Sequence, residues 1–450
     1  VNLMKAMIEV ALGEEPGNLE AVHNKVSIER AIIPKPGILS KINNLDKTLK
    51  IPGVNNIFLN VEPGDAIKMP KSNVEKPGNI IITADSLQQV NEIYEKCKNT
   101  LSFDINETPE LSMGYIRQKA REKFKKLCYV CKSCDGYDCA SGVPGMGGTG
   151  TGESFRRNKD ALQQYKITTR LIHDAKTPEI KTSIFGINLE IPVMAAPITG
   201  SVTNMGGAIE ELDYNLAVVK GALDAGTLAF VGDGATPDKY KIGLKAVSGF
   251  DGMGIPIFKP RSDNEEIIKR IKAAEKAKAI AVGMDIDAIS FKTMAMRKQS
   301  VGPKSVAELK ELVSSTKLPF ILKGIMSIQD AQKAYEAGAK AIIISNHGGR
   351  VLDEMAGTMD VLEEITAVVK DKMTILIDGG FRSGVDVFKA LALGAHGVLI
   401  GRPVSIAAVG AGEKGTKFYF NIIKKELQKA MLLTGCKSLE DINKDLIKKI

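Results

Sequence analysis

From about residue 185 onward, short apolar runs alternate with amphipathic stretches. The apolar runs are nearly continuous, which is typical of parallel strands buried on both faces, and the intervening stretches, such as Asn264–Lys278 and Met359–Lys370, have helical spacing. The eight runs are Ile191–Ile198, Thr227–Asp233, Ile255–Lys259, Ala279–Asp285, Pro319–Gly324, Ala341–His347, Thr374–Gly380 and Gly397–Arg402. Eight successive strand–helix units predict an α/β fold, a closed (β/α)₈ TIM barrel over residues 185–450. An open doubly wound sheet is disfavoured because no Gly-x-Gly-x-x-Gly turn follows the first run.

The residues before the barrel have a different sequence pattern and divide into two parts. Residues 1–105 combine β-rich runs, Pro-Gly turns and a helical stretch over Ser86–Thr100, which predicts a small α+β domain. Its β-rich runs are Glu29–Ile33, Asn56–Val61 and Asn79–Thr83. Residues 106–184 hold a basic helix at Met113–Lys126, four clustered cysteines and a glycine-rich segment at 142–152. We expect a Cys-rich connector whose glycine-rich segment is either flexible or folded tightly onto its surroundings.

Composition and charge narrow the class of protein. The chain is 44% hydrophobic and 25% charged, as in ordinary globular proteins, and no apolar run is long enough to span a membrane. Its formal charge of +8 comes from lysines interleaved with glutamates, the pattern of solvated helix faces. With no Trp and 5% aromatic residues, base-stacking platforms are not expected. These features predict a cytoplasmic protein that binds neither nucleic acid nor membrane, and we expect a homo-oligomer.

Four of the six cysteines lie close together in the connector: Cys128, Cys131, Cys134 and Cys139. Clustered thiols in a cytosolic chain indicate a metal site more often than disulfides. The spacing Cys-x₂-Cys-x₂-Cys-x₄-Cys is closer to ferredoxin-type loops than to zinc ribbons, which separate two distant pairs. An iron–sulfur cluster is therefore the first interpretation, zinc the second, and unliganded reduced thiols the third.

Polar or ionisable residues stand at nearly every strand end of the predicted barrel, although the strand bodies are apolar. In chain order, these ends are Pro197, Asp233, Lys259, Asp285, Lys323, His347, Asp378 and Arg402. Active sites of such barrels lie at the carboxyl ends of the strands. A barrel with a purely structural role would not need this ring of ionisable groups, so the pattern predicts an enzyme.

Three strand ends carry more specific chemistry. His347 and Arg350 lie three residues apart in Ser-Asn-His-Gly-Gly-Arg, which pairs a candidate general base with a guanidinium suited to a carboxylate. Asp378-Gly379-Gly380-Phe381-Arg382 and Gly401-Arg402-Pro403 follow strands seven and eight, where barrels commonly bind a phosphate through backbone N–H groups. Lys323 ends strand five and would stabilise negative charge on a reduced cofactor or, taken alone, form a Schiff base.

Together these residues resemble the FMN-dependent 2-hydroxy acid oxidases and dehydrogenases. The resemblance covers roughly residues 155–440 and rests on LPFILKGI (318–325), SNHGGRVLD (345–353) and ILIDGGFRSGVDVFKALALGAHGVLIGRP (375–403). It implies FMN as cofactor, His347 as base, Arg350 as carboxylate ligand and Asp285 as the aspartate that orients the histidine. It implies that the flavin is bound by Ala196, Pro197, Lys323, Asp378, Gly379, Gly380, Arg382, Gly401 and Arg402.

The strand-three region departs from the family pattern. Phe258 takes the place of the family's active-site tyrosine, Pro256 that of a flavin-contacting glutamine, and Gly283 that of a threonine on strand four. Lys259 and Arg261 are added cations near the expected mouth. We therefore expect Phe258, Lys259 and Arg261 to join Arg350 in binding substrate, the added cations serving a substrate with a second negative group.

Residues 1–105 resemble the C-terminal lobe of ATP-grasp carboxylate–amine ligases. The resemblance rests on IPKPGILSKI (33–42), IPGVNNIFLNVEPGD (51–65) and KPGNIIITADS (76–86). The carboxylates that bind ATP and magnesium in that family have no counterpart in this chain. We therefore expect no ligase activity here, and interpret the lobe as part or remnant of a longer ligase–flavoenzyme fusion.

The leading functional prediction is oxidation of a small 2-hydroxy acid to the 2-oxo acid. His347 would take a proton either from the substrate hydroxyl group or from the carbon that bears it, and the sequence leaves both routes open. The electron acceptor is also open, oxygen and an electron-acceptor protein being the two possibilities. Alternative interpretations are an FMN-dependent isomerase on a related barrel and a non-catalytic subunit that binds flavin and metal.

Overall fold

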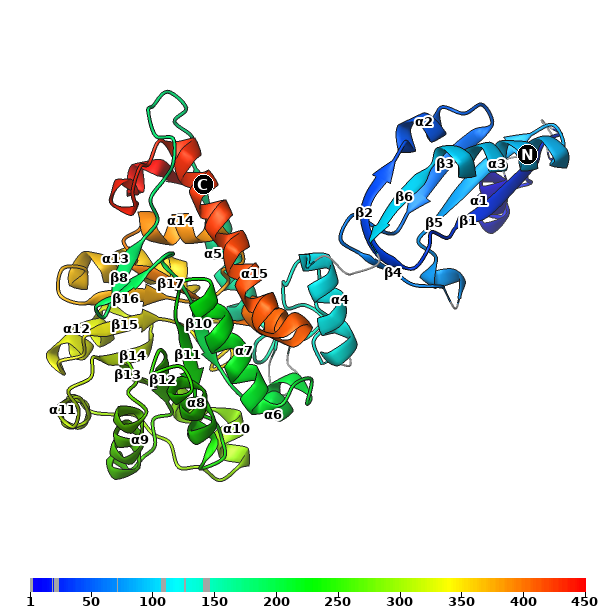
Figure 1. Ribbon diagram of the computed structural model, residues 1–450. Helices are drawn as coiled ribbons and strands as arrows, with labels where there is room; N and C mark the ends of the chain where they lie inside the picture. The colour runs from blue at the N-terminus through cyan, green and yellow to red at the C-terminus, as the bar shows by residue number, and fades with distance from the viewer. Residues whose placement is uncertain are drawn as a thin grey trace. The chain divides into compact units, whose positions relative to one another are not determined.

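The computed structural model describes residues 3–17, 19, 24–70, 72–106, 111–124, 127–140 and 146–450. The chain forms two compact units, Val1–Tyr115 and Ile116–Ile450 (Figure 1). The predicted connector is not a unit of its own, because its residues from Ile116 onward belong with the barrel. No helix among the described residues combines the length and apolar character needed to cross a membrane.

The first unit is a small α+β domain, as predicted. Its two sheets have the strand orders β1-β5-β3 and β4-β2-β6, with antiparallel pairing. The strands are β1 Val26–Ile32, β2 Gly37–Asn43, β3 Val54–Leu59, β4 Ala66–Ile67, β5 Gly78–Ala84 and β6 Ser102–Asn106. Its helices are α1 Leu3–Ala11, α2 Leu45–Leu49 and α3 Leu87–Thr100. Helix α3 begins after its N-cap Ser86 and buries Val90 and Cys97 against Ile80 and Ile82 of β5.

The second unit contains a closed barrel of eight parallel strands, which confirms the predicted fold (Figure 1). The strands are β10 Val193–Ile198, β11 Ala229–Gly232, β12 Ile255–Phe258, β13 Val282–Asp285, β14 Phe320–Ile325, β15 Ala341–Ile344, β16 Thr374–Ile377 and β17 Gly397–Ile400. Strand β17 pairs with β10 and closes the ring. Apolar side chains such as Ile257, Ile321, Ile343 and Leu399 form one buried cluster.

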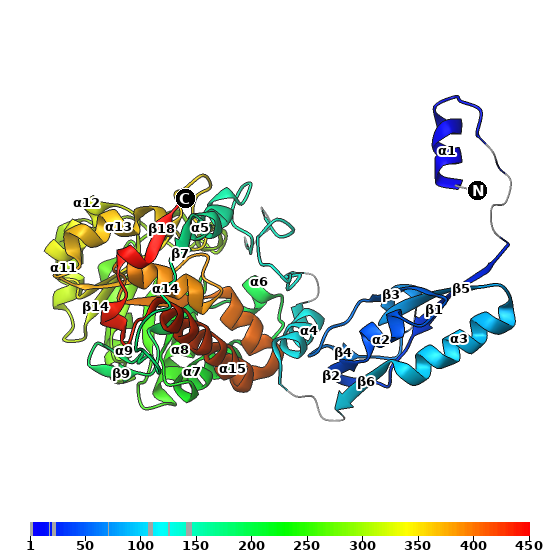
Figure 2. The ribbon, with the colours of Figure 1, turned by 90° about the horizontal axis from the view of Figure 1, so that it is seen from above.

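Helices surround the strands and complete the α/β architecture. They are α6 Ser201–Met205, α7 Glu211–Asp224, α8 Lys239–Ser248, α9 Asn264–Lys276, α10 Lys292–Met296, α11 Val306–Ser314, α12 Ile328–Glu336, α13 Thr358–Val369, α14 Gly384–Ala392 and α15 Arg402–Thr434. Helix α15 contains a break at Ala411 and Gly412, whose backbone angles are not helical. Two short antiparallel pairs lie outside the barrel. One is β8 Thr182–Ile184 with β9 Ile187–Leu189, and the other is β7 Tyr165–Ile167 with β18 Ile447–Lys449, which lie side by side in Figure 2.

The connector packs onto the carboxyl end of the barrel through its second helix and the described part of its glycine-rich segment. It contributes α4 Met113–Phe124 and α5 Glu153–Gln163. The Thr149 N–H donates to the Gly349 carbonyl (2.7 Å), and the Asp353 carboxylate accepts from the Glu153 N–H (3.0 Å). Residues 146–152 are therefore folded onto the barrel, the second of the two states expected for this segment, whereas residues 142–145 lie outside the described residues.

Candidate active site

A hollow of about 810 Å³ lies at the carboxyl ends of the barrel strands, where the sequence predicts the site. Its lining includes all nine predicted flavin-binding residues: Ala196, Pro197, Lys323, Asp378, Gly379, Gly380, Arg382, Gly401 and Arg402. His347 and Arg350 line the same hollow, as does Met146 of the connector.

Two glycines after β16 let the connector helix α5 approach the cavity. Gly379 and Gly380 have φ values of +97° and +84°, which disfavour any side chain. A Cβ on either would lie 2.8 Å from an oxygen of Asn158 in α5. The Asn158 side chain in turn donates to Asn346 Oδ1 (2.8 Å) and accepts from the Thr358 N–H (3.0 Å), which ties α5 to the strand ends.

The same end of the cavity suits an anion. Helix α15 begins at Arg402, and helix N-termini expose unpaired N–H groups that bind phosphate. The buried Nε of Arg382 has no hydrogen-bond partner among the described residues. Phe155 of α5 lies beneath the Arg402 guanidinium, 4.5 Å from ring centroid to Cζ. Four basic side chains (Lys323, Arg350, Arg382 and Arg402) and one acidic side chain (Asp378) line the hollow, so its charge fits a phosphate together with a carboxylate.

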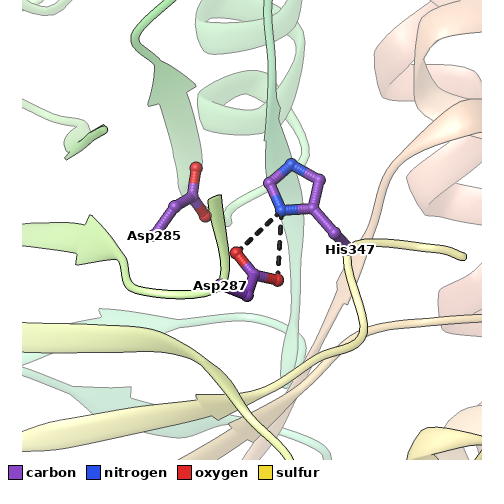
Figure 3. Close-up of side chains that lie close together, drawn as sticks. All are labelled: Asp285, Asp287 and His347. Carbon is purple, nitrogen blue, oxygen red and sulfur yellow. Dashed lines mark hydrogen bonds and ion pairs between the residues drawn. The ribbon is translucent and has the colours of Figure 1, made fainter. Parts of the chain in front are cut away.

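His347 follows β15 in a left-handed backbone conformation, with φ of 57°. Its Nδ1 lies 3.0 and 3.2 Å from the two carboxylate oxygens of Asp287 (Figure 3). Its ring also lies 4.9 Å from that of Phe291 between centroids. Burial, and then the charges of Lys323 and Lys259, lower the pKa of His347 well below 6.5. The imidazole is therefore neutral near pH 7, and with Nδ1 directed at Asp287 its other nitrogen is the one left to accept a proton.

The expectation that Asp285 orients His347 is wrong, because Asp287 makes that hydrogen bond. Asp285 ends β13, and Figure 3 shows no dashed line between it and His347. Its carboxylate pairs with Lys259 Nζ (2.7 Å) and Lys323 Nζ (3.2 Å). Burial alone would raise the pKa of Asp285, but these two ammonium groups lower it below its ordinary value. The chain then turns, and Gly324, with φ of +103°, leaves room for Asp287, to which a Cβ would come within 2.6 Å.

Arg350 lies beside His347 on the same cavity wall. Its Nη2 donates to Asn204 Oδ1 (3.1 Å), and its guanidinium lies 5.0 Å from the centroid of the Phe291 ring. Burial and then the charge of Arg402 lower the pKa of Arg350 to about 10, so the group remains a cation near pH 7. Phe291 and Asn204 thus hold the base and the cation in fixed relation to one another.

The structure changes the expected roles of the strand-three residues. Phe258 lies on the outer side of β12, its ring 5.9 Å from that of Tyr240 in α8, and it does not line the cavity. Alternation along the strand explains this, because Ile257 faces the barrel interior. Arg261 is buried and pairs with Asp233 (3.2 Å), just as Lys259 pairs with Asp285. Both cations are thus ion-paired; Lys259 lines the second hollow described below, whereas Arg261 lines neither hollow.

A second hollow, of about 620 Å³, adjoins the first. Both are lined by Pro197, Ile198, Asn204, His347 and Arg350, so the candidate base and cation stand where the two meet. Lys259 and Phe291 line only the second hollow. With a phosphate-bearing cofactor in the first hollow (the cofactor hollow), the second (the substrate hollow) would be left for a substrate.

Sequence reasoning missed three residues of this site: Asp287, Asn204 and Phe291. Asp287 follows Asp285 by two positions, and the glycine inside β14, Gly324, was an available signal that another backbone approaches there. Asn204 and Phe291 lie in loops and short helices after β10 and β13, where no periodic pattern marks them. Only the structure, which shows how these segments fold over the strand ends, identifies them as part of the site.

The four connector cysteines gather near the phosphate end of the cavity. All are free, half-buried thiols. Cys134 Sγ accepts a hydrogen bond from Arg382 Nη2 at 3.6 Å. Burial, and then the neighbouring Cys134 and Cys128, raise the pKa of Cys139 to about 11, so these groups lie within electrostatic reach of one another.

Comparisons with known proteins agree with this geometry. The model of the FMN-dependent dehydrogenase family matches residues 145–307 and 289–449, and that of the L-amino acid ligase C-terminal domain 2 matches residues 30–106. A peroxisomal (S)-2-hydroxyacid oxidase of Arabidopsis thaliana is 31% identical over 67% of this chain and 90% of its own length. An L-lactate oxidase of Nostoc is 30% identical over 66% of this chain and 90% of its own.

Solved structures give the same result. Mandelate oxidase with (S)-2-phenylpropionate has a TM-score of 0.60 and 27% identity, covering 75% of this chain and 98% of that chain. A mandelate oxidase variant with an FMN adduct has a TM-score of 0.58 and 27% identity, covering 73% and 97%. Residues 30–106 are thus similar to the C-terminal domain 2 of L-amino acid ligases, and from residue 145 onward the chain belongs to the family of FMN-dependent dehydrogenases that oxidise 2-hydroxy acids.

Proposed function

We propose that this chain oxidises a small 2-hydroxy acid to the corresponding 2-oxo acid, with His347 as base and Arg350 as the ligand of the substrate carboxylate. The observation that carries the proposal is the placement of a neutral, Asp287-bound imidazole and a cationic guanidinium on one wall, where the cofactor and substrate hollows meet. A 2-hydroxy acid offers one carboxylate and one removable proton on adjacent carbons, which matches this pair.

Different residues of the cavity would bind different parts of the cofactor. Arg382, Arg402 and the N-terminus of α15 would hold the phosphate of FMN, and Lys323 would stand beside its ring system. Bound there, FMN supplies the acceptor for the two electrons that leave the substrate. Burial alone would lower the pKa of Lys323, but Asp285, Asp378 and Asp287 raise it well above its ordinary value, so the ammonium keeps its charge.

His347 performs the proton step. Its depressed pKa keeps it unprotonated in the resting enzyme, ready to take a proton from the substrate hydroxyl group or from the carbon that bears it. Once protonated, the ring is a cation in a buried site, where an unpaired charge is costly. The Asp287 carboxylate on Nδ1 offsets that charge and fixes the ring orientation, as a buried carboxylate does for a catalytic histidine.

Anaerobic mixing of the FMN-loaded protein with a panel of 2-hydroxy acids tests the proposal. We expect one or more acids to bleach the long-wavelength band of oxidised flavin, with the 2-oxo acid formed in equal amount to reduced flavin. Acids that lack the 2-hydroxy group serve as controls and should leave the band unchanged. Flavin that no acid bleaches, in a protein that still converts a substrate, would contradict the proposal and favour an isomerase.

Arg350→Lys should weaken substrate binding more than it slows the chemical step. Lysine keeps the charge but loses the planar two-point contact with a carboxylate. Charge-assisted hydrogen bonds of this kind contribute roughly 1.5–3 kcal/mol, so we expect the KM to rise about 10- to 150-fold. Steady-state kinetics on the best acid measure this, with Arg170→Lys, at an exposed position outside both hollows, as the matched control. An unchanged KM would remove Arg350 from carboxylate binding.

The pH profile should reveal the depressed pKa of His347. Because the base form persists below the ordinary histidine pKa, kcat/KM should stay level as the pH falls through 6.5 and decline only in more acidic solution. Lys259 is one of the charges that depress this pKa, so Lys259→Met should move the acid limb to higher pH. Lys269→Met on the exposed face of α9 is the control and should leave the limb in place. An unmoved limb in Lys259→Met would contradict the assignment.

A further inference from the structure

The flavin chemistry proposed above leaves one feature of the site unused: the loop of residues 127–140 that carries the four cysteines. This loop is fixed to its surroundings at several points between the thiols. Arg121 donates to the carbonyls of Tyr129 (3.2 Å) and Val130 (2.9 Å), and Lys159 Nζ donates to Ser133 Oγ (2.7 Å). The Gly147 N–H donates to the Cys139 carbonyl (2.9 Å). The loop thus holds its thiols in a defined place.

A glycine in this loop shows how closely it packs. Gly136 has φ of +84°, and a Cβ at this position would lie 2.5 Å from the ring of Phe155. Phe155 also lies beneath the guanidinium groups of Arg402 and Arg382, at 4.5 and 5.9 Å from ring centroid to Cζ. The cysteine loop and the two phosphate-end arginines therefore share one aromatic neighbour.

The two arginines connect the thiols to the cofactor cavity. Arg382 lines the cavity and donates to Cys134 Sγ, and Arg402 lines the cavity within electrostatic reach of Cys134, Cys139 and Cys128. Four thiolates around a metal centre carry net negative charge, which nearby guanidinium groups offset. The site therefore combines four soft ligands with the cations that such a group needs.

The spacing of the sulfurs distinguishes between metal groups. A tetrahedral zinc ion with Zn–S bonds of ~2.3 Å draws its sulfurs to about 3.8 Å from one another. Among the residues that the structure describes, no three of these sulfurs lie within 4.8 Å of one another; the one such group of potential ligands is Asp285, Asp287 and His347. No three of these sulfurs are therefore as close together as the ligands of a tetrahedral zinc ion.

We propose that Cys128, Cys131, Cys134 and Cys139 bind an iron–sulfur cluster beside the phosphate end of the flavin cavity. The two successive x₂ spacings, the fixed loop and the two shared arginines all support this group. A redox-active cluster next to a redox cofactor also has a use that a structural zinc ion in the same place lacks. The proposal concerns metal binding and stands whichever 2-hydroxy acid is the substrate.

Metal analysis of the full chain, purified without oxygen, tests the proposal. We expect iron and acid-labile sulfide in equal amounts, with an electron paramagnetic resonance signal after dithionite reduction that is separate from any flavin signal. Cys131→Ser and Cys139→Ser should lose the iron, the sulfide and the signal while retaining FMN. Cys97→Ala and Cys436→Ala, which change the two cysteines outside the loop, are the matched controls and should retain the cluster.

Two outcomes would overturn the proposal. One is zinc in place of iron, bound in proportion to the chain. The other is a chain that holds no metal even after anaerobic incubation with ferrous iron and sulfide, with four loop thiols that all react with a thiol reagent. Both outcomes are measured on the unsubstituted protein, so a variant that fails to fold cannot hide them. Flavin bleaching by a 2-hydroxy acid is measured separately, so failure of the cluster leaves the oxidation untouched.

Discussion

We expect His347→Gln to slow the bleaching of bound flavin by substrate roughly 10²- to 10⁴-fold, the contribution typical of a positioned general base. Glutamine fills similar space and keeps a polar contact with Asp287, but it cannot accept the substrate proton. FMN affinity should change little, because the phosphate-end residues Arg382 and Arg402 are intact. Stopped-flow absorbance under anaerobic conditions measures the rate, and flavin fluorescence measures retention of FMN.

His396→Gln is the matched control for this prediction. His396 is also partly buried, but it precedes β17 and therefore stands at the opposite end of the barrel, where its Nδ1 accepts from the Ile375 N–H at 2.9 Å. Its substitution tests the loss of an imidazole from the barrel without touching the cavity. A His347→Gln rate within a few fold of the unsubstituted protein would mean that another group takes the proton.

The barrel is predictable from sequence because its strands are buried on both faces. The run Ala341–Ile344, for example, has no polar side chain, and the recurrence of such runs at regular intervals between amphipathic helices is typical of a parallel barrel. The first unit is harder to predict. Strand β2 begins at Gly37, in a Pro-Gly pair that is typical of a turn, and β6 follows directly after α3. Neither strand carries the apolar continuity that marks the barrel strands.

The phosphate end of the cavity is also predictable. The glycines after β16 mark backbone conformations that a side chain would disfavour, and an arginine follows each of β16 and β17. The hydrogen-bond partner of His347 could not be predicted in the same way. Asp285 and Asp287 are both carboxylates of one short stretch, and motif similarity favours Asp285. Only the turn after β13, and the space left by Gly324, bring Asp287 to the imidazole.

The third barrel strand, β12, shows that similarity of a motif does not always identify which side chain of a strand faces the site. Phe258 stands where motif similarity places the family's tyrosine, yet its side chain packs against Tyr240 on the outer side of β12. The period-two alternation of a strand puts Ile255, Ile257 and Lys259 on the other side. Of the predicted substrate residues on this strand, Lys259 lies on that other side and lines the second hollow, whereas Phe258 does not.

Asp285→Ala should be the most destabilising single change in the site. It removes the carboxylate that stands between Lys259 and Lys323, both of which are almost fully buried. Loss of one partner from a buried ionic group costs about 3–5 kcal/mol, because it leaves uncompensated charge in a poorly solvated place. We expect the free energy of unfolding of the barrel unit to fall by that amount. Urea unfolding followed through flavin fluorescence measures it, since the flavin reports on the barrel and not on the N-terminal domain.

The double variant Lys259→Met/Asp285→Ala separates charge from packing. Lys323 keeps Asp378 as a partner at 3.6 Å, so removing Lys259 as well takes away the ammonium that Asp285→Ala leaves unpaired. The double variant should therefore be more stable than Asp285→Ala alone, by about 0.5–3 kcal/mol, the usual coupling between residues in contact. A double variant that is less stable than the single one would mean that the cost comes from lost packing.

The pH dependence of this loss has a fixed sign. The pKa of Asp285 is lower in the folded protein than its ordinary value, because Lys259 and Lys323 outweigh the effect of burial. A carboxylate of this kind stabilises the fold fully above the pKa it has in the unfolded chain, and its contribution disappears as the pH falls through the folded-state pKa. The gap in unfolding free energy between the unsubstituted protein and Asp285→Ala should therefore be widest near neutral pH and shrink in acid. A gap that stays constant on acidification would show that folding leaves the pKa of Asp285 unchanged, and a gap that widens in acid would show that the carboxyl is neutral in the folded protein; either result would contradict the charge network described here.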